Sequence, residues 1–389
     1  MRSTIHLAAA LAFAATAATA QTPLKPDVPM ILAWTPEQQA RWYPAIEDVF
    51  RVATVKAGGK VRPLPWADKR IDDVGFEHDG RRFTTADYMA AYNVSGVLVL
   101  KDGKILMERY GMGRKPRDRW TSFSVAKSVT STLVGAAIQD GKIRSLHEPV
   151  TTYLPELKGS AYDGVTVRQL LMMSSGVKWN EDYSDPNSDV ARAGGPTGEP
   201  GNPILNYMRK LPRAHPPGTR FNYNTGETDL VGLMLARAVG KPISQYASEK
   251  LWKPYGMERD AIWMTDAQGA ERGGCCMSMT LRDYGRVGQF ILDGGKAGRR
   301  QVLPPDFVRE AITPQIREGA PEPGYGYFWW MRPQGGFEAR GIYGQGILIV
   351  PEERLVVVVN SAWPRAVGRD LGAPRTAFYE AIRAAARAF

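Results

Sequence analysis

The sequence predicts an α+β fold: an antiparallel sheet formed by both ends of the chain and flanked by helices, with a largely helical lobe inserted between them. Helical and loop patterns dominate the middle of the chain, from residue 121 to about residue 312. Runs typical of strands occur on either side of this region, at residues 94–100, 104–110, 326–331, 341–350 and 354–360.

The first twenty residues have the pattern of a secretory signal peptide. Arg2 supplies the positive start, residues 5–17 are apolar and rich in alanine, and Ala18-Thr19-Ala20 fits a small-x-small cleavage site. The apolar stretch is too short for a convincing membrane anchor, and no later segment has the composition of a membrane span. We therefore expect an exported protein, periplasmic in a Gram-negative cell.

Residues 21–389 are expected to form one domain of two lobes. The sheet lobe comprises about residues 21–120 and 313–389, and the helical lobe about residues 121–312. A cleft should open where the two lobes meet, because the helix with the strongest chemical motif begins there.

A helix is predicted to begin at Pro36, with Thr35 as its N-cap. Its apolar face continues along the chain, through Ile46, Val49, Phe50 and Ala53.

Two hairpins and a closing helix are predicted in the sheet lobe. Lys101-Asp102-Gly103 and Pro351-Glu352-Glu353 each separate two strand-like runs, as hairpin turns do. The last helix should bury one stripe of side chains, formed by Phe378, Ile382, Ala385 and Phe389.

Charge and metal-ligand content exclude several function classes. The net charge is +10, but the Lys and Arg residues are scattered, which favours a solvated basic surface over a nucleic-acid partner. The chain has four histidines and two neighbouring cysteines, Cys275 and Cys276, in no zinc-ligand pattern. We therefore expect no metal and no cofactor, and no disulfide framework, since neighbouring cysteines rarely bond to each other.

The strongest motif is Ser124-Val125-Ala126-Lys127. A serine and a lysine three residues apart lie on one face of a helix, so the lysine nitrogen can reach the hydroxyl. The surrounding residues are apolar almost all round, which predicts a buried helix. Burial lowers a lysine pKa, and a neutral lysine can remove the serine proton and make it a nucleophile.

Tyr223 lies in a turn rich in Gly and Asn, spanning residues 217–226. Such a turn can present a phenol to a cleft, where a nearby ammonium would favour the phenolate and allow proton transfer. The alternative is a half-buried tyrosine that fills a loop.

Glycines flank Ile342 and Tyr343 just before an apolar strand, in Arg340-Gly341-Ile342-Tyr343-Gly344. Glycine at a strand edge lets a ligand approach backbone N–H groups, as an oxyanion hole requires. The alternative is a bulged edge strand.

Together these motifs resemble the serine β-lactamase and penicillin-binding-protein-like hydrolases, in the branch of class C β-lactamases, family VIII esterases and 6-aminohexanoate-dimer hydrolase. The resemblance extends over roughly residues 85 to 365. It rests on the order and spacing of Ser124-x-x-Lys127 and of residues 165–176, 217–232, 273–278 and 341–360.

The resemblance implies a β-lactamase/transpeptidase-like fold and a role for each motif. Ser124 would be the acylated nucleophile, Lys127 its general base, and Tyr223 the group that protonates the leaving group and activates water. The backbone N–H groups of Ser124 and of Ile342, or a neighbour from Gly341 to Gly344, would form the oxyanion hole.

The sequence departs from the family pattern at two motifs. The second motif, usually Tyr-x-Asn, is Tyr223-Asn224-Thr225, and the third contains Arg340 where a lysine or histidine is usual. In the family, that lysine or histidine would hold the carboxylate of a β-lactam. Because this chain has Arg340 instead, we expect weak activity on β-lactams. The variants lean toward the esterase and aminohexanoate-dimer hydrolase side, where Tyr183, in an acidic turn, would belong to a mobile substrate loop.

The sequence alone predicts an exported serine hydrolase that cleaves a small amide or ester through an acyl-enzyme on Ser124. Two alternatives stay open: a D-amino-acid or cell-wall peptidase or β-lactamase, and a non-catalytic envelope protein that binds peptide or glycan. Ser124, Lys127 and Tyr223 together favour the enzyme.

Overall fold

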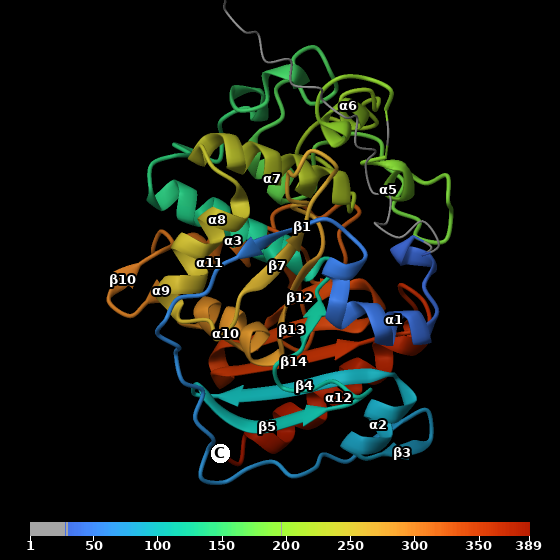
Figure 1. Ribbon diagram of the computed structural model, residues 1–389, viewed down its shortest axis with the longest axis vertical. Helices are drawn as coiled ribbons and strands as arrows, with labels where there is room; N and C mark the ends of the chain where they lie inside the picture. The colour runs from blue at the N-terminus through green and yellow to red at the C-terminus, as the bar shows by residue number, and fades with distance from the viewer. Residues whose placement is uncertain (1–27, 29, 196) are drawn as a thin grey trace, which may run out of the picture.

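A computed structural model describes residue 28, residues 30–195 and residues 197–389. Its centre is a six-stranded antiparallel sheet built from both ends of the described chain, which confirms the α+β prediction (Figure 1). The strand order is β11 (Trp330–Met331), β12 (Phe337–Gly341), β13 (Gln345–Val350), β14 (Leu355–Ser361), β4 (Val94–Lys101) and β5 (Lys104–Tyr110).

Side chains of the sheet alternate between two apolar layers. On β14, Val356 and Val358 pack into the core shared with α10 (Leu281–Leu292), whereas Val357 and Val359 face α12 (Arg369–Ala386). All four are fully buried. A strand buried on both faces must be apolar at every position, which explains its continuous valine run.

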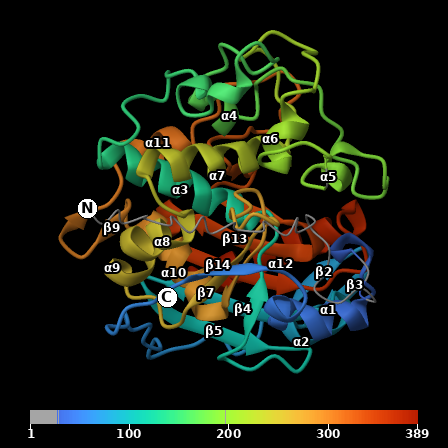
Figure 2. The same ribbon diagram turned by 45° about the horizontal axis from the view of Figure 1, so that its top comes forward.

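The helical part lies above the sheet in Figures 1 and 2, with α3 (Val125–Gln139) against α7 (Thr225–Val239) at its centre. Residues 125 to 137 of α3 are buried without exception, which confirms the prediction of a buried helix. The remaining α-helices are α1 (Pro36–Trp42), α2 (Thr85–Ala91), α4 (Val167–Leu171), α5 (Asp189–Arg192), α6 (Pro203–Met208), α8 (Ile243–Ala247), α9 (Lys253–Tyr255) and α11 (Phe307–Ala311).

A second antiparallel sheet joins the N-terminal region to the middle of the chain, which the sequence reading missed. Its strand order is β1 (Val52–Val55), β7 (Ala261–Met264), β8 (Met277–Thr280) and β6 (Arg119–Thr121). Its strands have at most four residues, too short for a clear alternation. Short two-stranded pairs are formed by β2 (Phe76–His78) with β3 (Arg81–Phe83) and by β9 (Lys296–Ala297) with β10 (Arg300–Gln301).

Three predicted elements have different bounds. The first helix ends at Trp42 and is followed by a 3₁₀ segment, Tyr43–Asp48, so that Ala53 lies in β1 instead. The predicted strand 341–350 is broken by a turn, Ile342–Gly344, where Tyr343 has a φ of 58°. The strand predicted at 326–331 is reduced to Trp330–Met331, because the backbone bends at residues 327–328.

The closing helix and both hairpins agree with the sequence. Phe378 and Ile382 are fully buried under the sheet and Ala385 packs against them, but Phe389 lies beyond the helix end and is exposed. The turns after β4 and β13 connect neighbouring antiparallel strands.

The sequence predicted no disulfide framework and left the state of Cys275 and Cys276 open. Their sulfur atoms are joined in a disulfide. The peptide bond between these two residues is cis, and their Cα atoms lie 3.4 Å apart.

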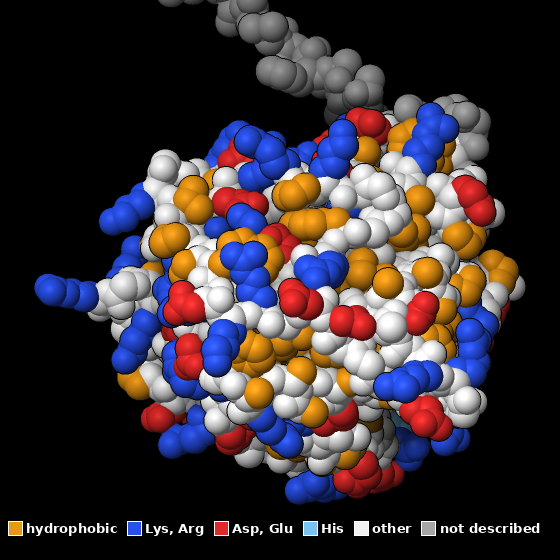
Figure 3. Space-filling view, turned by 90° about the horizontal axis from the view of Figure 1, so that it is seen from below, with side chains coloured by type: hydrophobic (Ala, Val, Ile, Leu, Met, Phe, Trp, Pro, Cys, Tyr) orange, Lys and Arg blue, Asp and Glu red, His pale blue; other side chains and the backbone are white. Residues whose placement is uncertain are grey.

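The surface carries both signs of charge. On the face seen in Figure 3, Lys and Arg side chains are interspersed with Asp and Glu. In the described part of the chain, no helix has both the length and the apolar composition needed to cross a bilayer. The predicted signal peptide, residues 1–20, lies outside the described residues.

Candidate active site

Ser124 lies at the N-terminal end of α3, in a turn fixed by the second sheet. Ser122 N–H donates to Met277 O at 2.7 Å, and Met277 N–H donates to Ser122 Oγ at 3.0 Å, so β8 holds the residues just before the serine. Phe123 has a φ of 44°, in the left-handed region that side chains rarely adopt. This backbone geometry places Ser124 at the mouth of two cavities.

Lys127 lies one helical turn after Ser124, as the spacing predicted. Its Nζ donates to Ser124 Oγ at 2.9 Å and to Gly274 O at 2.7 Å, and its side chain is buried. Both acceptors are neutral groups, and no carboxylate of the described residues forms an ion pair with the lysine nitrogen.

Burial lowers the pKa of Lys127 to about 8, although the charges of Glu181 and Asp229 act in the opposite direction. The sequence-based expectation of a lowered pKa is therefore confirmed. A substantial fraction of this lysine is neutral near pH 8, the form in which an amine can accept a proton.

The Gly274 carbonyl that accepts from Lys127 is held by α7. Gly274 N–H donates to Asp229 Oδ1 at 2.9 Å, and Arg272 forms a buried ion pair with the same carboxylate at 2.6 Å. A Cβ at Gly274 would lie 2.9 Å from Thr225 O. Residues 273–274 are therefore glycines because the segment passes directly over the start of α7.

Tyr223 immediately precedes Asn224, the N-cap of α7. Its ring lies 5.3 Å from Lys127 Nζ and packs against Trp330, with a centroid distance of 5.2 Å. Burial raises the pKa of Tyr223 well above its ordinary value, and a hydrogen bond with Ser124 lowers it only in part. The expected phenolate is therefore wrong: desolvation and the charge of Glu181 both raise the pKa of Tyr223, and the hydroxyl stays protonated.

Gly341, at the end of β12, lies directly against the serine turn. A Cβ there would stand 2.4 Å from Ser122 O, so only glycine allows this approach. Gly341 and Ile342 both line a cavity with Ser124. The structure thus brings the third motif to the nucleophile, as the oxyanion-hole hypothesis needs.

Tyr343 lies elsewhere. Its N–H donates to Ala366 O at 2.9 Å and its hydroxyl to Leu32 O at 2.8 Å, and it lines neither cavity at Ser124. Its ring packs on Phe123, with a centroid distance of 5.1 Å. The structure therefore gives Tyr343 a contact with the N-terminal segment, and it does not bring the side chain to the substrate cavities.

Tyr183 and Arg340 do face the substrate side. Tyr183 lines both cavities and donates its hydroxyl to Glu181 Oε1 at 2.7 Å. Arg340 is partly exposed, donates its Nε to the buried Glu338 at 2.7 Å, and lies 5.3 Å over the Trp330 ring. Arg340 forms part of the wall of the larger of the two cavities at Ser124, which has a volume of about 370 Å³.

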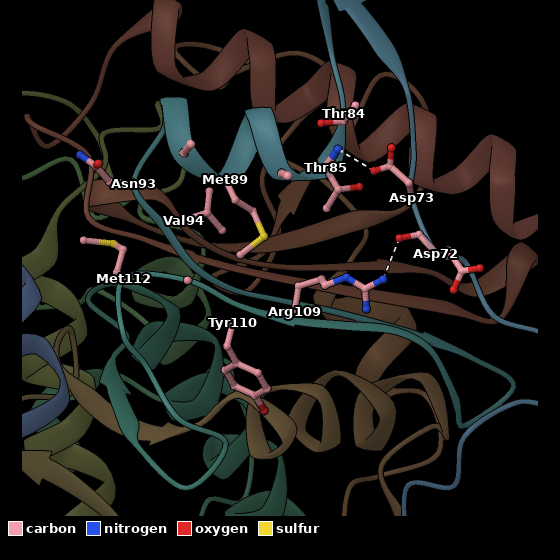
Figure 4. Close-up of a pocket in the computed structure, with 13 residues that line it drawn as sticks. Asp72, Asp73, Thr84, Thr85, Met89, Asn93, Val94, Arg109, Tyr110 and Met112 are labelled. Atoms are coloured by element: carbon pink, nitrogen blue, oxygen red, sulfur yellow. Dashed lines mark hydrogen bonds between the residues drawn. The ribbon is translucent and has the colours of Figure 1, made fainter.

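Two cavities meet at Ser124, with volumes of about 80 Å³ and about 370 Å³. A larger one, of about 640 Å³, lies between α2 and β5 and is lined by none of the predicted site residues (Figure 4). Arg109 donates to Asp72 O there at 2.7 Å, and Thr85 N–H donates to Asp73 at 2.8 Å. Size alone would select this cavity, whereas the contact between Ser124 and Lys127, whose pKa is lowered, favours the cavities at Ser124.

The family model described as Beta-lactamase matches residues 81–379, which include every motif of the site. The chain belongs to the beta-lactamase family. Within the family it is similar to 6-aminohexanoate-dimer hydrolase of Paenarthrobacter ureafaciens, at 36% identity over 69% of this chain and 72% of that protein. It also resembles a beta-lactamase of Pseudomonas fluorescens, at 25% identity over 54% of this chain and 55% of that protein.

Solved structures of the beta-lactamase family share its fold. A putative 6-aminohexanoate-dimer hydrolase from Bacillus anthracis superposes with a TM-score of 0.79 at 24% identity, covering 88% of this chain and 93% of that one. A class C beta-lactamase mutant superposes with a TM-score of 0.56 at 18% identity, covering 76% and 94%. The chain is a hydrolase of this family, as its named relatives are.

Sequence reasoning missed a buried ionisable group beside the candidate site. Glu227, on the first turn of α7, accepts hydrogen bonds from Ser175 Oγ and, at 3.3 Å, from Asn224 Nδ2. Burial raises the pKa of Glu227 to about 8. The available signal was the spacing of Asn224 and Glu227, an N-cap residue followed three positions later by a glutamate.

Proposed function

We propose that the chain is an exported serine hydrolase that cleaves a small amide or ester through an acyl-enzyme on Ser124. The observation that carries the proposal is the contact between Lys127 Nζ and Ser124 Oγ at 2.9 Å, made by a buried lysine whose pKa is lowered to about 8. A base must be both within hydrogen-bond distance and partly unprotonated near the working pH, and Lys127 meets both conditions.

In acylation, Lys127 accepts the Ser124 proton while Oγ forms a bond to the substrate carbonyl carbon. The oxygen of the tetrahedral intermediate is stabilised by the N–H groups of Ser124 and Ile342, because the N–H of Tyr343 already donates to Ala366. Tyr223, protonated because burial raises its pKa, gives a proton to the leaving nitrogen or oxygen as its bond to carbon breaks. The Lys127 ammonium then returns a proton to the phenolate.

In deacylation, water attacks the acyl carbon and its proton passes to the Tyr223 and Lys127 pair. The second tetrahedral intermediate collapses by breaking the bond to Ser124 Oγ, which takes the proton back. The protein groups required in each step are Ser124, Lys127 and Tyr223, which lie next to one another. The reaction as written consumes no cofactor.

For the substrate class, the name of the Paenarthrobacter relative points to a linear, unbranched amide. The described third motif contains no lysine or histidine, only Arg340, whose Nε is already bonded to Glu338. We therefore expect hydrolysis of simple amides and esters, and poor turnover of penicillins and cephalosporins.

We also propose that the chain is exported from the cytoplasm. Arg2, the apolar residues 5–17 and the Ala18-Thr19-Ala20 site support export and cleavage after residue 20. N-terminal sequencing of the protein recovered from the periplasm would test this directly. A start at Gln21 supports export, and an intact start found only in the cytoplasm overturns it.

The test is labelling of the purified chain with a fluorophosphonate, followed by a turnover panel of p-nitrophenyl esters, short linear amides and β-lactams. We expect one covalent adduct, on Ser124, and no labelling of Ser124→Ala. Turnover should appear for esters and amides and be far weaker for β-lactams. An adduct on another residue, or full activity of Ser124→Ala, would refute the mechanism, and absence of all labelling and turnover would favour a non-catalytic binding protein.

A further inference from the structure

The two cavities at Ser124 differ in chemistry. Both are lined by Ser124, Tyr183 and Ile342, so a substrate bound across the serine has one half in each. The larger cavity, of about 370 Å³, is lined by three charged residues, namely Glu181, Arg340 and Arg375. The smaller one, of about 80 Å³, has mainly apolar walls.

Among the described residues, the one charged side chain in the wall of the smaller cavity is that of Arg272. Its guanidinium donates to the Asp229 carboxylate through Nε at 2.8 Å and through Nη2 at 2.6 Å, and both side chains are almost fully buried. Because this charge is already neutralised, the smaller cavity favours an uncharged group.

Tyr223 determines which half of a substrate occupies which cavity. It lines the larger cavity and is absent from the wall of the smaller one. The group that protonates the leaving atom must reach that atom, so the leaving group belongs in the larger cavity. The acyl group then lies on the other side of Ser124, in the smaller cavity.

The N-terminal segment closes this smaller cavity. Met30, Ile31 and Leu32 form part of its wall, and Ile31 packs into the same apolar cluster as Phe50 and Phe123. The segment is held in place by the hydrogen bond from Tyr343 Oη to Leu32 O, at 2.8 Å. Tyr343 thus connects the turn after β12 to the cavity wall.

We propose that the smaller cavity is the acyl-binding subsite, that it takes short, unbranched, uncharged acyl chains, and that the segment of residues 30–32 limits their length. The inference rests on the proposed function. An apolar cavity of about 150 Å³ holds a molecule the size of benzene, so one of about 80 Å³ accommodates roughly four carbons.

The test is a series of p-nitrophenyl acetate, butyrate, hexanoate and octanoate, which vary the acyl chain and keep one leaving group. The wild-type chain should turn over acetate and butyrate well. Its kcat/KM should fall by about tenfold or more once the chain outgrows the cavity.

Two variants change the cavity in opposite directions. Ala191 lies on α5 in its wall, so Ala191→Phe should fill it and reduce kcat/KM for butyrate relative to acetate by about tenfold. Ile31→Ala should enlarge it and move the preference toward hexanoate. Val367→Ala is the matched control, because Val367 lines only the larger cavity and is 59% exposed.

The outcomes separate this inference from the proposed function. If the wild-type chain is neither labelled at Ser124 nor active on any ester, the proposed function fails. If it is active but Ala191→Phe keeps the wild-type chain-length profile, the subsite assignment is overturned, whatever Ile31→Ala does to folding. A changed acyl profile in Val367→Ala would place the acyl group in the larger cavity and overturn the assignment as well.

Discussion

The interface between α3 and α7 and the interface between β12 and α12 both bury ionisable side chains, but they treat them in opposite ways. Lys127 and Glu227, at the first interface, contact only neutral hydroxyl, amide and carbonyl groups. Glu338, at the second, contacts three arginines: Arg340 at 2.7 Å, and Arg332 and Arg375 at 3.3 Å.

The pKa values of Lys127, Glu227 and Glu338 depend on whether a group of opposite charge lies beside them. Burial acts on all three groups, lowering the pKa of Lys127 to about 8 and raising that of Glu227 to about 8. At Glu338 the desolvation is outweighed by the arginines, and the pKa falls to about 2. Burial without an opposite charge therefore produces a group that exchanges protons near neutral pH, whereas burial with one produces a fixed charge.

The largest effect is expected at Lys127. Lys127→Met keeps the apolar stem and removes the amine, so kcat should fall by about 10²–10⁴-fold, the range for a lost general base. Because the replaced group is a buried amine without a carboxylate partner, the melting temperature should be unchanged or raised. Ester turnover and differential scanning fluorimetry measure the two, and a large drop in both would make Lys127 a structural residue.

Tyr223→Phe should remove the proton donor and leave the packing on Trp330 intact. We expect a loss of roughly 10²–10⁴ in kcat for amides and a smaller loss for p-nitrophenyl esters, because nitrophenolate leaves without protonation. Equal losses for both substrates, or a lower melting temperature with unchanged amide hydrolysis, would contradict the assignment.

Glu338→Gln tests the opposite kind of site. It leaves three buried or half-buried arginines without their shared carboxylate, and the free energy of unfolding should fall by about 3–5 kcal/mol. Ser124 should still react with fluorophosphonate at temperatures where the protein is folded. Urea unfolding gives the first quantity, and unchanged stability would show that the arginines do not depend on Glu338.

Glu227→Gln should have a smaller, pH-dependent effect. The folded-state pKa of Glu227, about 8, lies above that of an unfolded chain, so the folded protein binds more protons and loses stability as pH rises toward 8. The wild-type chain should lose roughly 2 kcal/mol from this group between pH 6 and pH 8, and Glu227→Gln should not. Parallel stability curves for the two proteins across this range would refute a neutral Glu227.

Much of the fold and of the candidate site could be predicted from the sequence. The helix of Ser124 and Lys127 and the hairpin pairs carry local signals in spacing and turn residues. The second sheet could not be predicted, since it joins short strands such as β1 and β7, more than two hundred residues apart in the chain.

The protonation states of the site residues could be predicted from the sequence only in part. The lowered pKa of Lys127 followed from an apolar helix, which is a local property. The protonated Tyr223, the arginines around Glu338 and the contribution of Ile31 to a cavity wall depend on tertiary packing. Tyr343 had a plausible motif, but its hydroxyl contacts Leu32, more than three hundred residues earlier in the chain.

The pH dependence of Ser124 acylation tests the central claim, that Lys127 acts as a neutral base, most directly. Single-turnover labelling with a fluorophosphonate should become faster with rising pH and level off with a midpoint near 8, where Lys127 loses its proton. Glu181→Gln should move the midpoint downward, because the Glu181 charge raises the pKa of Lys127. A midpoint above pH 10, as for an ordinary lysine, or a rate independent of pH, would contradict the claim.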